Sequence, residues 1–168
     1  MQTRLPVVRP GLQGGASLNE RPWDHPRFRN WIWVGRLHAI WDARLSAAIA
    51  PHGIRLAQFD ILANLVHEPG ITQQHLAKRL FIGRSSLSMA LPELERMGWL
   101  RREGDPEDKR IRRLFLTPEG VAKAELGLAE QLRLLKEMMT VLTAEECDQL
   151  GEKARRMADH LKKMPETR

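Results

Sequence analysis

The chain has 168 residues, 42% hydrophobic and 29% charged, a composition typical of one soluble globular domain, alone or with a small appended element. The formal net charge of +6 favours a polyanionic partner, and the single cysteine excludes an intramolecular disulfide framework and favours a reducing, cytoplasmic setting. No apolar run approaches the roughly 18–20 residues of a membrane span, and the first residues lack the apolar core of a secretion signal.

The positive charge is concentrated in the middle of the chain. Residues 78–113 hold ten basic and six acidic side chains, whereas residues 114–168 hold nine and ten. The basic middle therefore predicts the contact surface for a polyanion, and the nearly neutral, Leu- and Met-rich end predicts a packing surface.

The N-terminal part predicts an arm followed by two helices. Residues 1–26 contain four prolines and three glycines and are expected to form a flexible arm. Residues 27–50 predict a long helix, and Pro51 and Gly53 end it. A second helix is predicted over residues 56–67. The apolar positions at helical spacing in the two helices are Val34, Leu37, Ile40, Trp41, Leu45, Ala48 and Ile49, then Phe59, Leu62, Leu65 and Val66.

Two shorter helices come next. Thr72 is a good N-cap for a helix over residues 73–80, and a tight turn is expected at Ile82-Gly83-Arg84. The following helix, residues 85–97, contains Pro92, so we expect a kink or a helix whose regular part begins later. Together they predict a helix-turn-helix. The predicted buried residues are Leu76, Ala77 and Leu80 in the first helix and Leu87, Leu91 and Leu94 in the second.

A β-hairpin is predicted after Gly98, which suits the left-handed position at a helix end. Residues 99–102 and 111–116 predict its strands, with a turn at residues 105–108. Thr117 then caps a helix that reaches about Met139. A capping box at residues 143–146 starts a last helix, whose apolar residues are Leu150, Ala154, Met157 and Leu161. The predicted fold class is mainly α with a small β-hairpin wing.

Three motifs stand out along the chain, and the last of them matches its family form without a gap. Residues 71–80 read IT-x-x-x-LA-x-x-L, residues 94–100 read LE-x-x-GW-L, and residues 108–120 read D-x-R-x-x-x-L-x-L-T-x-x-G. In this combination the chain resembles the MarR family of bacterial transcriptional regulators over about residues 30 to 160.

The resemblance implies a winged helix-turn-helix domain at residues 56–118 on each protomer of a homodimer. It implies a helical dimerisation region built from residues 27–55 and 119–164. The second helix of the motif would enter the major groove of DNA and the wing the adjacent minor groove. Small aromatic acids often release the DNA in this family.

The wing provides the first DNA-contact candidates. An arginine at its tip, Arg110, suits a narrow minor groove, and Asp108 is expected to hold that side chain and the turn. Lys109 and either Arg112 or Arg113 are expected at phosphates, because strand alternation sends Arg112 and Arg113 to opposite faces.

The helix-turn-helix provides the remaining candidates. Serine hydroxyls near a helix N-terminus suit phosphate contacts, and Arg84 suits guanine. For each individual serine, a cap or solvent contact is an equal alternative. The candidates off the apolar face are Gln73, Gln74, Arg84, Ser85, Ser86, Ser88 and Met89.

The long first helix suggests an effector site. Trp33 and Trp41 would line it, and Arg36 or His38 would pair with a carboxylate. A dimer core explains the tryptophans equally well. The six histidines lack ligand-like spacing and Cys147 suits a structural role, so no metal ion or cofactor is expected.

The sequence therefore predicts a regulator and not an enzyme, since it contains no Ser-His-Asp order and no glycine-rich phosphate loop. It is expected to bind a palindromic operator as a repressor that an aromatic or phenolic carboxylate releases. The alternative is a winged-helix module for protein interaction, without sequence-specific DNA binding.

Overall fold

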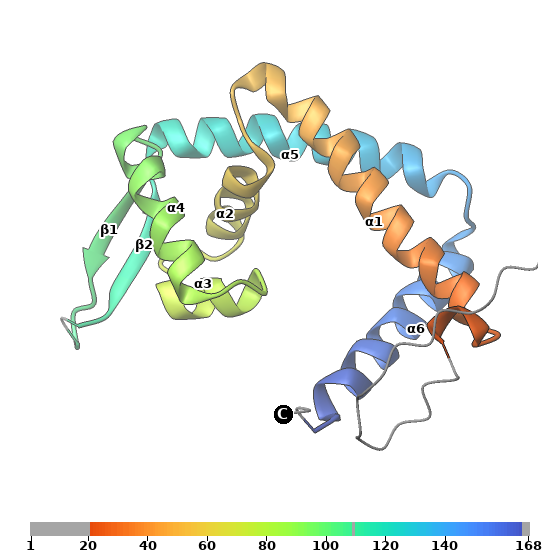
Figure 1. Cartoon of the computed structure of the whole chain (residues 1–168). Coiled ribbons are helices and arrows are strands. Elements are labelled where there is room, and N and C mark those ends of the chain that lie inside the picture. Colours follow the sequence, from red (N-terminus) through yellow and green to blue (C-terminus); the bar gives the residue numbers. More distant parts are fainter. Residues whose placement is uncertain (1–20, 109, 166–168) are drawn as a thin grey trace, which may run out of the picture. The chain divides into compact units, whose positions relative to one another are not determined.

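The computed structural model describes residues 21–108 and 110–165 (Figure 1). The described residues divide into two compact units, a first unit that ends at Ala39 and a second unit that begins at Ile40. Residues 1–20 of the predicted arm and Lys109 of the predicted DNA contacts lie outside the described residues. The described part is helical apart from one two-stranded sheet, which confirms the predicted fold class.

The first unit contains η1 (Pro22–Asp24) and the N-terminal part of α1 (Phe28–Ile49). In η1 the main-chain N–H of Arg21 donates to the Asp24 carboxylate at 3.0 Å. η1 lies within residues 1–26, where the sequence predicts a flexible arm. The proline fixes φ in this turn, and the Asp24 side chain satisfies a terminal amide. The flexible arm itself stays a prediction.

α1 confirms the helix predicted for residues 27–50, and η2 (Ala50–His52) follows it. In the second unit α1 contributes Leu45 and Ile49 to the core, with Trp41 partly buried beside them. The N-terminal part of the predicted apolar face is exposed in the single chain, namely Val34, Leu37 and Ile40.

The core of the second unit forms around α2 (Leu56–His67) and α5 (Pro118–Met139). A Cβ atom at Gly127 of α5 would overlap the ring of Phe59 on α2, so the glycine permits this close approach. The sequence predicts Val66 on the buried side of α2, but Val66 is exposed and Ile61 is buried instead. The reason is that α2 contacts both α5 and the hairpin, so the buried side of α2 faces both elements and includes Ile61 instead of Val66.

α3 (Gln73–Arg79) and α4 (Arg84–Arg96) form the predicted helix-turn-helix. The hydroxyl of Thr72 accepts the amide of His75 at 3.2 Å, which confirms the predicted cap. Between the helices Phe81 has a φ of 54°, because the amide of Ile82 bonds back to the carbonyl of residue 77 at 3.1 Å and closes the end of α3.

The turn and the start of α4 differ from the prediction. Gly83 is the extended N-cap of α4, with a φ of −66°, and Arg84 is already helical. Pro92 lies inside a helix whose regular part begins at Arg84, so a later start is wrong. Packing explains this outcome, because Leu91 and Leu94 on either side of the proline are fully buried.

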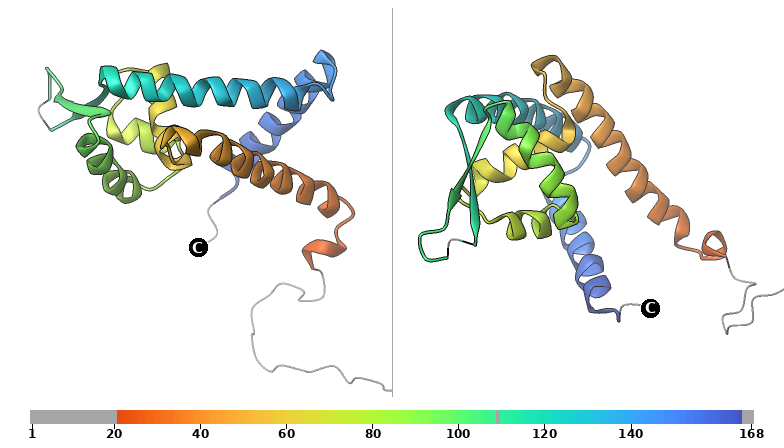
Figure 2. Two further views of the ribbon diagram at one scale, coloured as in Figure 1. Left: turned by 90° about the horizontal axis from the view of Figure 1, so that it is seen from above. Right: turned by 60° about the vertical axis from the view of Figure 1, so that its left-hand side comes forward.

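The wing consists of β1 (Leu100–Gly104) and β2 (Arg112–Leu116), which pair antiparallel with Leu100 opposite Leu116 and Gly104 opposite Arg112. Gly98 has the predicted left-handed conformation, with a φ of 73°. α3 and α4 pack beside the hairpin, as Figure 2 shows from two sides. α3, α4 and the wing therefore contribute to the same surface of the second unit.

α6 (Ala144–Lys163) ends the described chain. Its predicted capping box is present: the Glu146 amide donates to the Thr143 hydroxyl at 3.2 Å, and the Thr143 amide donates to the Glu146 carboxylate at 2.8 Å. None of the described residues of α6 is buried in the single chain. Among the residues that the structure describes, no helix has both the length and the apolar character for crossing a bilayer.

Candidate nucleic-acid interface

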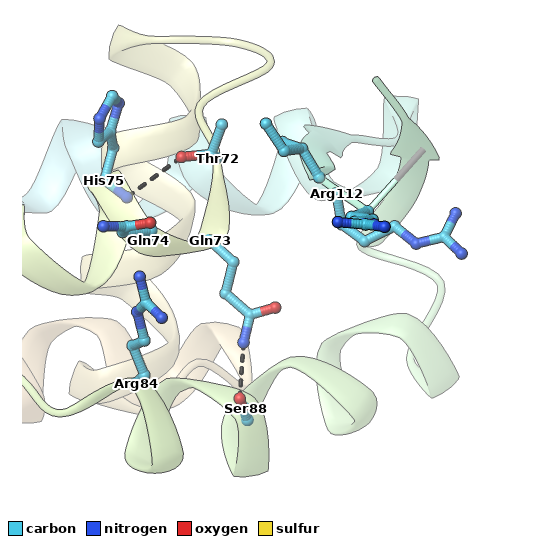
Figure 3. A pocket seen from close by; sticks show the side chains of 9 residues that line it. Thr72, Gln73, Gln74, His75, Arg84, Ser88 and Arg112 are labelled. Atoms are coloured by element: carbon cyan, nitrogen blue, oxygen red, sulfur yellow. Dashed lines mark hydrogen bonds between the residues drawn. The ribbon is translucent and has the colours of Figure 1, made fainter. Parts of the chain in front are cut away.

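A hollow of about 420 Å³ lies where the N-terminal ends of α3 and α4 meet the tip of the wing (Figure 3). It brings together six of the predicted DNA-contact residues: Gln73, Gln74, Arg84, Ser88, Arg110 and Arg112. Thr72, His75 and Ile111 complete its lining. The hollow thus joins residues that are up to 40 positions apart in the sequence.

Hydrogen bonds fix the α3–α4 side of the hollow. The Gln73 side-chain amide donates to the hydroxyl of Ser88 at 2.6 Å, a bond that ties the start of α3 to α4 (Figure 3). With its oxygen accepting from Gln73, Ser88 keeps a hydroxyl proton to donate elsewhere. Ser88 is therefore held in place as a donor.

The charge of the hollow is positive. Three guanidinium groups line it, those of Arg84, Arg110 and Arg112, and none of the described lining residues is acidic. Guanidinium groups with amide and hydroxyl neighbours form charge-assisted hydrogen bonds to phosphate oxygens. The arrangement suits a phosphate backbone.

Asp105 holds the turn of the wing, a role that was not predicted from the sequence. Its carboxylate accepts the main-chain amides of Glu107 and Asp108 at 2.9 and 3.1 Å and the Nε of Arg113 at 2.5 Å. These amides, and then Arg113, lower the pKa of Asp105 below its ordinary value. The available signal was an aspartate followed by proline at the start of a turn, which is typical of side-chain-to-backbone capping.

Arg113 connects the wing to the loop between α2 and α3. Besides Asp105, it donates through Nη1 to the carbonyl of Gly70 at 3.1 Å. Arg112, its neighbour, lines the hollow instead. The two arginines therefore have different roles, as strand alternation predicts.

Asp108 contacts the main chain of the wing tip. Its carboxylate accepts the amide of Arg110 at 2.9 Å. Asp108 therefore helps to hold the turn, as predicted, through the backbone of Arg110. Of the other predicted DNA contacts, Ser85, Ser86 and Met89 lie exposed on α4 outside the lining of the hollow.

The four residues of the predicted effector site lie along α1. Trp33 is 59% exposed, and the guanidinium of Arg36 lies 5.2 Å from the centre of its ring. His38 is exposed on the same helix, and Trp41 is partly buried against the core of the second unit. The Trp33–Arg36 pair combines an aromatic face with a cation.

The part of the chain that forms the helix-turn-helix and the hollow is similar to known proteins. The model of the MarR family matches residues 52–111, which contain the helix-turn-helix, β1 and the turn of the wing. The HTH-type transcriptional regulator YdgJ of Bacillus subtilis is 34% identical over 94 residues, which are 56% of this chain and 57% of that protein.

Two solved structures match over most of their length. A mutant of MarR from Escherichia coli complexed with operator DNA is 30% identical, covering 77% of this chain and 96% of that chain, with a TM-score of 0.66. PcaV, a transcriptional regulator from Streptomyces coelicolor in complex with its natural ligand, is 25% identical, covering 85% and 98%, with a TM-score of 0.64. The chain is thus 30% identical to a solved MarR chain over 96% of that chain, and it has the wing and helix-turn-helix described above. It therefore belongs to the MarR family.

Proposed function

We propose that the chain is a sequence-specific DNA-binding transcriptional regulator that acts as a homodimer on a palindromic operator. The observation that carries the proposal is the convergence of Arg84, Arg110 and Arg112 in one hollow between the helix-turn-helix and the wing. α4 enters the major groove and Arg110 the adjacent minor groove, while Arg112 and Gln73 meet phosphates. The similar MarR of Escherichia coli was solved in complex with operator DNA, which supports DNA binding by this chain.

The regulator acts as a repressor that a small aromatic or phenolic carboxylate releases. The exposed Trp33 ring with Arg36 beside it offers stacking and a charge for such a ligand. The complex of PcaV with its natural ligand supports a small-molecule effector. Release follows if the ligand binds best to a conformation that does not fit DNA.

Selection from a random DNA library by the full chain tests DNA recognition. We expect enrichment of a palindrome with half-sites roughly 34–36 Å apart and an affinity that falls steeply with salt. Arg110→Ala should lower specific binding by about 1–3 kcal/mol. Arg133→Ala, which removes an exposed arginine on α5 that pairs with Glu130, is the matched control.

The selection and the Arg110→Ala variant distinguish sequence-specific DNA binding from a protein-interaction module. Unchanged affinity of Arg110→Ala for the selected site would contradict the role of the wing. A library without enrichment would favour the protein-interaction module.

The effector proposal needs its own measurement. Aromatic carboxylates should quench tryptophan fluorescence and lower affinity for the selected DNA, and Arg36→Ala should weaken both effects together. If Arg36→Ala responds like the wild type, the ligand does not bind beside Trp33.

A further inference from the structure

The outer face of α4 carries two apolar side chains where the proposed function brings DNA bases. Leu87, Leu91 and Leu94 fix the buried side of this helix. With about 3.6 residues per turn, Met89 and Pro92 lie on the opposite side, between Ser85 and Arg96. Met89 is 81% exposed and Pro92 is exposed as well.

Around the helix, Ser88 and Glu93 lie on the two sides of this apolar strip. Each has a partner in the chain, and Ser88 keeps its hydroxyl proton for a contact elsewhere. On one side Ser88 accepts from Gln73 at the edge of the hollow. On the other side the Glu93 carboxylate is paired with the guanidinium of Arg55, which competes with its acceptance of a cytosine amino group. On the outer face, the stretch between Ser85 and Arg96 therefore presents a base with the carbon and sulfur atoms of Met89 and Pro92.

The chemistry of the major groove identifies what such a strip recognises. Among the base edges, the C5 methyl of thymine is the apolar group, whereas the other groups are hydrogen-bond donors and acceptors. A thioether chain adapts to such a methyl, and the rigid proline ring loses little conformational entropy on contact. The basic hollow beside the strip favours a polyanion over a protein partner as the occupant.

We propose that Met89, with Pro92 beside it, reads the C5 methyl of a thymine in each operator half-site. The inference rests on the proposed function and adds to it the base that α4 selects. Serines of the first turn and Arg84 then supply polar contacts, while Met89 and Pro92 supply an apolar surface that fits the methyl group.

Deoxyuridine scanning tests the inference, because it removes only the methyl group. In the site selected by the full chain, each thymine is replaced in turn, symmetrically in both half-sites. The wild type should lose roughly fourfold in affinity per lost methyl contact, hence more than tenfold for the pair, at one thymine position. Met89→Ala should bind the unmodified site more weakly and be insensitive to uracil at that position.

Two variants sharpen the comparison. Met89→Leu keeps an apolar side chain of similar size and should retain the response to uracil. Met89→Gln keeps the length, replaces the thioether by an amide, and should lose that response. Because Met89 is so exposed, circular dichroism should show the wild-type fold in all three variants.

The outcomes remain separable from a failure of the proposed function. A selected site in which the wild type tolerates uracil at every position overturns the inference and leaves DNA recognition intact. The inference also falls if Met89→Ala keeps the wild-type response to uracil. A library without any enrichment overturns the proposed function, and the inference with it.

Discussion

Asp105 joins the turn of the wing to β2 through two amides and Arg113. Its lowered pKa means that it stabilises the fold above the ordinary aspartate pKa, and that this contribution is lost as pH falls through the lower pKa of the folded state. Asp105→Asn should therefore lower the urea midpoint at neutral pH, and its difference from the wild type should shrink below about pH 4. Urea unfolding from pH 7 to 2 measures this, and a constant difference would contradict it.

Phe81 is 87% exposed and has a left-handed backbone conformation that glycine adopts without strain. That conformation costs an L-residue roughly 1–2 kcal/mol, while glycine adds about 0.4–1 kcal/mol of entropy to the unfolded chain. Phe81→Gly should therefore stabilise the fold by up to about 1.6 kcal/mol in urea unfolding. Phe81→Ala removes the same ring but keeps Cβ, so an equal gain for alanine would show that strain is not the cause.

At the scale of elements, the contact between α5 and α2 depends on the missing side chain of Gly127. A Cβ atom there would overlap the Phe59 ring, so Gly127→Ala should destabilise the fold by about 1–3 kcal/mol. Gly151 on α6 has nothing within 4 Å of an added Cβ, and Gly151→Ala should stabilise its helix by about 0.5–1 kcal/mol. Thermal unfolding of both variants measures the contrast, and two effects of the same sign would contradict the packing argument.

The elements themselves were largely predictable, because caps and apolar spacing act within one or two turns of chain. Thr72, Thr117 and Thr143 each cap the helix that the sequence predicts after them. The left-handed residue between α3 and α4 was not predictable from glycine content, because the main-chain bonds that end α3 place Phe81 there instead of Gly83.

The residues of the candidate site were predictable where they lie within a single sequence motif. Arg110 and Arg112 follow from the wing motif, and Arg84 from the start of the second helix. The bond from Arg113 to the carbonyl of Gly70 was not, because it joins residues 43 positions apart and depends on how the hairpin packs on the loop before α3. Nor did the sequence show that Gln73 bonds to Ser88, since that contact requires the angle between two helices.

At the scale of the whole molecule, one chain leaves large apolar side chains uncovered. On α6, Leu150, Met157 and Leu161 recur on one side of the helix, and all three are about half exposed. Leucine and methionine side chains gain about 1.5–3 kcal/mol when they are buried. A homodimer would bury this side of α6, and in a symmetric dimer each side chain contributes twice.

Replacing Leu161 by glutamate tests this proposed interface. Two buried leucines are lost per dimer and two charges are added, so Leu161→Glu should weaken dimerisation by at least roughly a hundredfold in sedimentation equilibrium. Arg155→Gln removes a charge on the opposite side of α6, where Arg155 pairs with Glu152 and Asp159, and should leave the dimer intact. Leu161→Glu should also lose affinity for the full palindrome while binding an isolated half-site like the wild type, because its α4 and wing are unchanged. A wild-type dimer constant for Leu161→Glu would mean that another surface joins the two chains.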